Sequence, residues 1–151
     1  MGKKDYSHIV ISEQIPEMWN PLNEDQRKLL SANCIFKKFK KNEDIYSEGD
    51  IPEHLMCLIS GKVKIYKEGV GGRNQIIRMI KPVEYFGYRA YFASEKYVTA
   101  AAAFESSVIC FIPMKLIAEF TCQNCEISTF FIKQLSIDLG IADERTVNLT
   151  Q

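Results

Sequence analysis

Short runs of apolar residues, separated by turn-forming residues, occupy the middle of the chain. In residues 62–67, Lys-Val-Lys-Ile-Tyr-Lys, charged and apolar positions alternate, which places Val63 and Ile65 on one face of a strand. Similar runs lie at residues 55–59, 75–80, 97–103 and 108–112. Glycine, proline and polar turns separate them at intervals of about ten residues. The pattern predicts a mainly β domain, built as an antiparallel sandwich, roll or barrel.

A helical pattern precedes these strands. Asn23 and Gln26 are spaced as a helix-capping pair, so a short helix is expected to begin here. We expect Leu29 and Leu30 to form its buried face and the helix to end near Asn33.

The period changes again after Pro113. Residues 114–120 suit a short helix, and the sequence from about Asn124 onward is typical of one long helix. Apolar residues three or four apart form a stripe along it, namely Ile127, Phe131, Leu135, Leu139 and Ala142. The stripe has two interpretations: the helix lies on its own β-domain, or it forms the seam of a homodimer. We favour the seam, because the stripe is longer than a small β-domain.

Composition narrows the class of protein. The chain has 151 residues, 46% of them hydrophobic and 25% charged, which is typical of one globular domain. Lys plus Arg and Asp plus Glu number 19 each, so the positive field that non-specific nucleic-acid binding requires is missing. No apolar run is long enough to cross a membrane, and the first residues do not resemble a secretory signal. The five cysteines are therefore expected to be reduced and the protein cytoplasmic.

Three segments together resemble a known family. They are GDIPEHLMCLISGKVKIYKEG at 49–69, ESSVICFIP at 105–113 and FIKQLSIDLGIADERTVNLTQ at 131–151. Their order and spacing are similar to those of the cyclic-nucleotide-binding sensor domain of Crp/Fnr transcription regulators. The resemblance implies an antiparallel β-roll of the double-stranded β-helix or jelly-roll kind, flanked by short N-terminal helices and a long C-terminal helix.

The resemblance also implies a domain plan and a function. We expect an extended N-terminal arm at 1–22, the β-roll sensor domain at 23–121 and the dimerisation helix at 122–151. A DNA-binding helix-turn-helix domain is expected after residue 151, so DNA would be contacted only through that domain. The function implied is that of a dimeric, non-enzymatic effector sensor. One alternative is a cyclic-nucleotide-binding module of a kinase or a channel.

A ligand pocket is the remaining implication of the resemblance. Its expected residues are Phe86, Gly87, Tyr88, Arg89, Ala90, Val98 and Thr99. Family members that bind cyclic nucleotides have a carboxylate where Tyr88 stands and an arginine where Val98 stands. Both charged contacts to the nucleotide are therefore missing, and we expect cyclic AMP and cyclic GMP to bind weakly or not at all. Arg89 offers a cation to a different anion, and no cofactor is required.

Other candidate chemistry is sparse. Cys122 and Cys125 form a single CxxC motif, which suits a redox sensor as a second alternative but falls short of the three or four ligands of a metal site. His8 and His54 are the only histidines, too few for a metal-dependent roll-fold enzyme. We therefore expect neither a metal site nor an enzyme.

Overall fold

The computed structural model describes the backbone of residues 10–150 and the side chains of residues 10–147. Six α-helices, one short 3₁₀ helix (η1) and eight β-strands follow one another within this part of the chain. In order they are α1 (Ile11–Gln14), α2 (Pro16–Trp19), α3 (Glu24–Asn33), β1 (Ile35–Phe39), β2 (Asp44–Tyr46), β3 (His54–Ser60), β4 (Val63–Glu68), η1 (Val70–Gly72), β5 (Asn74–Ile80), β6 (Tyr85–Phe86), α4 (Arg89–Phe92), β7 (Ala100–Ala103), β8 (Ser107–Pro113), α5 (Met114–Gln123) and α6 (Cys125–Thr150).

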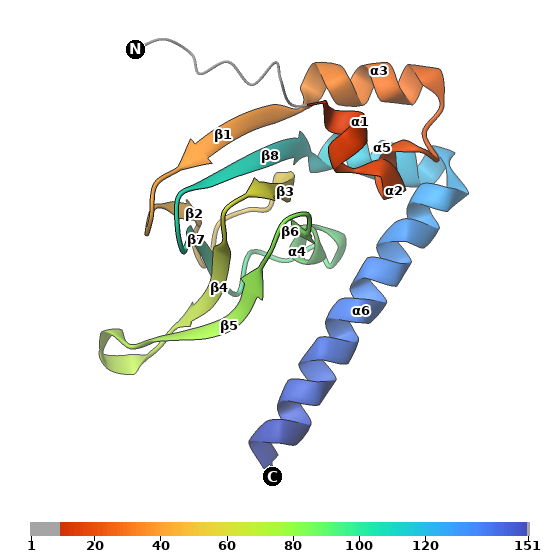
Figure 1. The fold of residues 1–151 in the computed structure, drawn as a ribbon. Coiled ribbons are helices and arrows are strands. Elements are labelled where there is room, and N and C mark those ends of the chain that lie inside the picture. Colours follow the sequence, from red (N-terminus) through yellow and green to blue (C-terminus); the bar gives the residue numbers. More distant parts are fainter. Residues whose placement is uncertain (1–9, 151) are drawn as a thin grey trace.

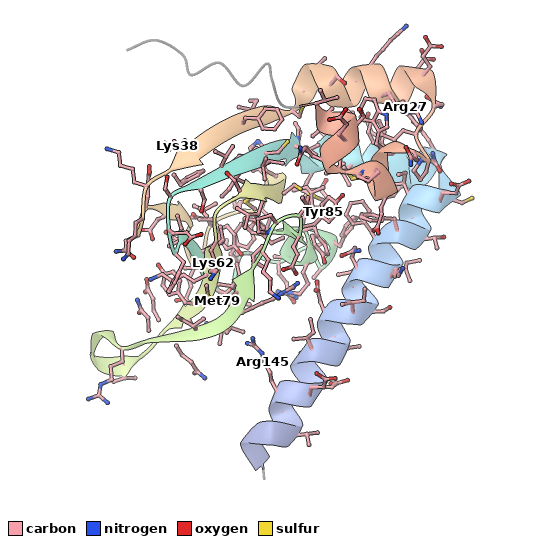
Figure 2. All side chains as sticks on the ribbon, in the orientation of Figure 1. Arg27, Lys38, Lys62, Met79, Tyr85 and Arg145 are labelled. Carbon is pink, nitrogen blue, oxygen red and sulfur yellow. The ribbon has the colours of Figure 1, made fainter. Side chains whose placement is uncertain are left out.

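The strands form two antiparallel sheets of four strands each. One sheet has the order β1-β8-β3-β6 and the other β2-β7-β4-β5. Side chains fill the space between the sheets, while α1, α2, α3 and α5 gather at one end and α6 runs past the roll (Figures 1 and 2). The predicted antiparallel roll with flanking helices is confirmed.

Short apolar runs between turn residues located most of the strands. Each of the five predicted runs contains a strand, although the run 97–103 becomes β7 only from Ala100. The prediction missed β1, β2 and β6. Strand β1 carries Lys37 and Lys38 on an edge of its sheet, and β6 has only two residues, so neither has a clear period of two.

Gly61 closes the turn between β3 and β4. Its φ is +97°, and a Cβ built on it would lie 2.3 Å from Ser107 Oγ and 2.5 Å from the Ser106 carbonyl oxygen. Only glycine allows both this conformation and this close approach of the β8 backbone.

The capping pair of α3 forms as expected. Asn23 Oδ1 accepts a hydrogen bond from the Gln26 backbone N–H at 2.8 Å, and Gln26 Oε1 accepts one from the Asn23 N–H at 3.0 Å. Leu30 is buried, but Leu29 is 47% exposed, so the expectation that both leucines lie on the buried face is wrong for Leu29.

The expected extended arm is wrong for residues 11–19. These residues form α1 and α2, and Ile15 and Met18 are buried in the main core cluster. Pro16 begins α2, where its missing N–H costs nothing. Residues 1–9 lie outside the described part of the chain.

Asn124 sets the direction in which α6 leaves the core. The long helix begins at Cys125, as its period predicted, whereas the domain plan that began it at residue 122 is wrong, because Cys122 belongs to α5. Asn124 Nδ2 donates to the Pro21 carbonyl oxygen at 2.8 Å, while its Oδ1 accepts from the Glu126 N–H at 3.1 Å. One side chain therefore joins the start of α6 to the N-terminal helices.

Only the first turns of α6 belong to the core. Ile127 and Phe131, predicted as seam residues, are buried in their own chain, and Leu135 packs against the same core cluster. Ile127 and Phe131 are thus unavailable to a second copy of the chain, so the prediction that these two residues belong to the dimer seam is wrong. Leu139 and Ala142 are exposed. None of the helices that the structure describes is both long and apolar enough to span a membrane.

The two halves of α6 are expected to respond differently to truncation. Phe131→Ala removes a buried aromatic ring and should lower the free energy of unfolding by about 3–5 kcal/mol. Arg145→Ala, the control at an exposed position on the second half of α6, should change it by no more than about 0.5 kcal/mol. Urea denaturation in dilute solution measures both, and an equal loss in the two variants would contradict the division.

Candidate functional site

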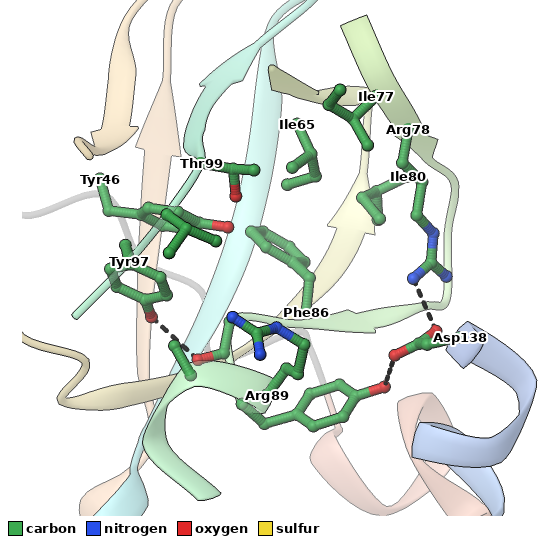
Figure 3. Close-up of a pocket in the computed structure, with 14 residues that line it drawn as sticks. Tyr46, Ile65, Ile77, Arg78, Ile80, Phe86, Arg89, Tyr97, Thr99 and Asp138 are labelled. Atoms are coloured by element: carbon green, nitrogen blue, oxygen red, sulfur yellow. Dashed lines mark hydrogen bonds and ion pairs between the residues drawn. The ribbon is translucent and has the colours of Figure 1, made fainter. Parts of the chain in front are cut away.

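A cavity of about 160 Å³ opens between the β2-β7-β4-β5 sheet, α4 and α6. All seven residues predicted for the pocket line it, and Figure 3 shows their arrangement. Sequence reasoning missed seven further lining residues, which are Tyr46, Ile65, Ile77, Arg78, Ile80, Tyr97 and Asp138. The wall is thus apolar over much of its area, with a few polar groups from separate elements.

Gly87 allows the chain to pass close to β3. Its φ is +85°, and a Cβ there would lie 2.0 Å from Met56 Cε. Tyr97 Oη–H donates a hydrogen bond to the Gly87 carbonyl oxygen at 2.9 Å. The Tyr97 ring also stacks on Tyr46, with ring centroids 3.8 Å apart. These contacts fix one side of the cavity.

Tyr88 directs its hydroxyl toward α6. Its side chain is buried, and its Oη–H donates a hydrogen bond to Asp138 Oδ2. Its ring packs edge to face with that of Phe131, with the ring centroids 5.7 Å apart. Burial, together with the hydrogen bond to the Asp138 carboxylate, raises the pKa of Tyr88 well above its usual range. Tyr88 is therefore a neutral phenol that contacts α6.

Arg78 is the most enclosed cation of the cavity. From β5 its Nη1 contacts Asp138 Oδ1 at 2.7 Å (Figure 3). Its Nη2 contacts Glu84 Oε2 at 3.0 Å. Burial opposes its charge, but attraction to Asp138 and the hydrogen bonds to both carboxylates raise its pKa. A single arginine within an apolar strand run is the sequence signal that could have revealed it.

The predicted residues Arg89 and Val98 lie at the rim. Arg89 forms an ion pair with Glu95 at 3.2 Å, with about half of each side chain exposed, so the pair contributes little stability. Val98 is 50% exposed. Ala90 is buried below them, and Thr99 lies beside the Tyr46 hydroxyl.

The tyrosines of the cavity are neutral at physiological pH. Burial raises the pKa of Tyr46 to about 12, although Thr99 and the two arginines lower it, and burial also raises the pKa of Tyr97. The charges that face a ligand are therefore those of the arginines and of Asp138. This arrangement can hold a small, largely apolar molecule and can bind an anion through a guanidinium group.

The cysteines fall into two groups. Cys122 and Cys125 are exposed free thiols at the junction of α5 and α6. Cys57 and Cys110 are buried in the main core cluster, Cys34 packs against that cluster, and interaction with the Cys110 thiol lowers the pKa of Cys34 to about 7. Within residues 10–150 no three His, Cys, Asp or Glu side chains are placed to hold a metal ion. His8 lies outside that range, and His54 packs against Phe111.

Two curated relatives differ greatly in length. An uncharacterized protein of Haemophilus influenzae is 31% identical over 110 residues, which make up 70% of this chain and 84% of that protein. A cGMP-dependent protein kinase of Toxoplasma gondii is 33% identical over 96 residues, 64% of this chain but only 9% of the kinase.

Solved structures share the fold. The sensor domain of the transcriptional regulator DNR from Pseudomonas aeruginosa has a TM-score of 0.76 at 20% identity and covers 89% of this chain and 91% of its own. A regulator described as Crp/Fnr family from Eubacterium rectale gives 0.74 at 19% identity, covering 82% and 58%. A transcriptional regulator from Thermotoga maritima gives 0.69 at 27% identity, covering 82% and 96%.

A family model described as the cyclic nucleotide-binding domain matches residues 36–124. The match runs from β1 to the end of α5 and so includes the strands and α4 that line the cavity. Because it covers more than half of the chain, the protein belongs to the cyclic nucleotide-binding domain family, and its structural neighbours include transcription regulators of the Crp/Fnr family.

Proposed function

We propose that this chain is the dimeric effector-sensing domain of a Crp/Fnr-type transcription regulator and controls a DNA-binding domain outside residues 1–151. The observation that carries the proposal is that one cavity is lined both by the β-roll and by Asp138 of α6. A molecule that fills the cavity therefore contacts the helix directly. A change of occupant can shift the position of α6, provided that it binds the two positions with different affinities.

An exposed apolar face of α6 supports self-association. Ile132 and Leu139 lie seven residues apart and so on one face of the helix, and they are 62% and 63% exposed where the helix continues past the roll (Figure 1). A second copy of the same helix would cover these side chains, as in two-stranded helical packing. The dimer seam proposed here therefore differs from the predicted one, because it omits Ile127 and Phe131 and retains Leu139.

The effector is proposed to be neither cyclic AMP nor cyclic GMP. The Tyr88 hydroxyl already donates its hydrogen bond to Asp138, and Val98 is an exposed aliphatic residue. Neither can make a charge-assisted contact to a cyclic phosphate or a ribose hydroxyl. Arg78 is already paired with two carboxylates.

A regulatory module of a kinase is the second candidate function. The identity of 33% to a cGMP-dependent protein kinase favours it. The two candidates differ at α6, because the exposed apolar residues of this helix suit a self-pairing seam.

The dimer is tested by a charge on the exposed half of α6. Leu139→Asp would place an unpaired carboxylate in the proposed seam, and we expect a monomer by sedimentation equilibrium where the parent chain is a dimer. The control is Leu29→Asp on α3, where the same change at an exposed leucine should leave the dimer intact. A parent chain that is monomeric at tens of micromolar would refute the seam and favour the kinase-type module.

Nucleotide binding is tested by calorimetry and thermal shift. The two missing charged contacts are worth about 1.5–3 kcal/mol each, so affinity should be lower by roughly a hundred-fold or more than in a complete site. We expect Val98→Arg to bind cyclic AMP about tenfold more tightly than the parent, because it adds a guanidinium at the rim. Val70→Arg, at a fully exposed position in the β4–β5 turn, should not. Micromolar binding of either nucleotide by the parent would contradict this assignment.

A further inference from the structure

Arg78 forms ion pairs with two carboxylates that come from different parts of the chain. Glu84 lies six residues further along and also accepts a hydrogen bond from the Lys81 N–H at 2.9 Å, so it is part of the local turn. Asp138 comes from α6, sixty residues away in sequence. The β-roll therefore already pairs Arg78 with one carboxylate, and α6 adds a second.

The Asp138 carboxylate occupies the position that a ligand anion would take. Asp138 lines the cavity, and one of its oxygens accepts a hydrogen bond from Arg78 Nη1 while the other accepts one from Tyr88 Oη–H. Its side chain is only 22% exposed, as is that of Arg78. An external carboxylate placed there can accept the same two hydrogen bonds, so the donor set suits exchange between an internal and an external anion.

The size and lining of the cavity limit the external anion. Beside Arg78 the wall consists of Ile65, Ile80 and Phe86, and the cavity volume is about 160 Å³. An apolar cavity of about 150 Å³ is filled by one benzene-sized molecule. The ligand that fits has a small aromatic or branched aliphatic body and one carboxylate.

Asp138 is also where the exposed half of α6 is tied back to the roll. Ile137 and Leu139 on either side of it are exposed, while the buried anchor residues Phe131 and Ile127 lie about two and about three turns earlier. Loss of the Asp138 contact would therefore release the later turns of α6 without unpacking the earlier ones.

We propose that Asp138 acts as an internal anion on Arg78, and that a small organic carboxylate replaces it there and so releases the second half of α6. This inference rests on the proposed sensing function, because it names the ligand class and the movement at the same cavity. The Asp138 carboxylate competes with the ligand for Arg78. The apparent affinity of the ligand is therefore its intrinsic affinity multiplied by the fraction of molecules in which Arg78 is not bound to Asp138.

The test uses benzoate as the carboxylate probe and benzamide as its uncharged counterpart. Calorimetry measures affinity, and hydrogen exchange follows the backbone amides of residues 132–147. The parent chain should bind benzoate and exchange these amides faster when it is bound. Asp138→Ala should bind benzoate at least about tenfold more tightly and should exchange fast even without it. The matched control is Asp143→Ala, at an exposed position on the same helix, which should behave as the parent does.

Arg78 is tested from the other side. Arg78→Gln should abolish benzoate binding, and circular dichroism checks that it folds. If it does not fold, Arg78→Lys is used instead. This variant keeps the positive charge but loses the paired N–H donors of the guanidinium, so benzoate binding should weaken about tenfold.

Three outcomes would overturn the exchange. They are equal benzoate affinity in the parent and Asp138→Ala, equal affinity of benzamide and benzoate, and no benzoate binding by either chain. Each leaves the oligomeric state and the nucleotide results untouched, so failure of the exchange is distinguishable from failure of the dimeric sensor. A monomeric parent in which Asp138→Ala tightens benzoate binding would refute only the dimer.

Discussion

The apolar contact between the start of α6 and the outer face of the β1-β8-β3-β6 sheet is the interaction on which the cavity depends. Ile127, Phe130 and Phe131 share one core cluster with Cys57 and Cys110 of that sheet. Phe131 also packs against the ring of Tyr88, and Tyr88 lines the cavity together with the residues next to it in the sequence. Without this contact Asp138 would have no fixed position, and the polar group that it forms with Arg78 and Tyr88 would not assemble.

This arrangement places a polar network directly beside an apolar anchor. Tyr88 is shared between the two: its ring packs on Phe131 and its hydroxyl contacts Asp138. A phenol suits this double position, because it combines a large apolar surface with one hydrogen-bonding group at its end. The same feature explains why a carboxylate at this position would be costly, since it would be buried next to Phe131 and Asp138.

The local pattern of the sequence was sufficient to predict most strands of the roll and the residues along one edge of the candidate site. Short apolar runs between turns predicted the interior strands, and the segment from Phe86 to Ala90 does line the cavity together with Val98 and Thr99. Arg78 and Asp138 were missed, because no local period reports that residues sixty positions apart form an ion pair. The stripe on α6 predicted an apolar face correctly, but period alone does not say what covers it. The structure divides that face into a part buried in its own chain and a part left exposed.

The position of Asp138 along α6 also determines how far the end of the helix can move. The buried side chain of Phe131 holds the early turns, so once the Asp138 contact is lost the later turns pivot at about this residue. At about 1.5 Å of rise per residue, the Asp138 contact lies roughly 10.5 Å beyond Phe131 and Thr150 lies roughly 28.5 Å beyond it. For a rigid rotation of this part of the helix, each ångström of travel at Asp138 becomes about 2.7 Å at Thr150. A small displacement close to the pivot thus corresponds to a larger one at the end of the helix.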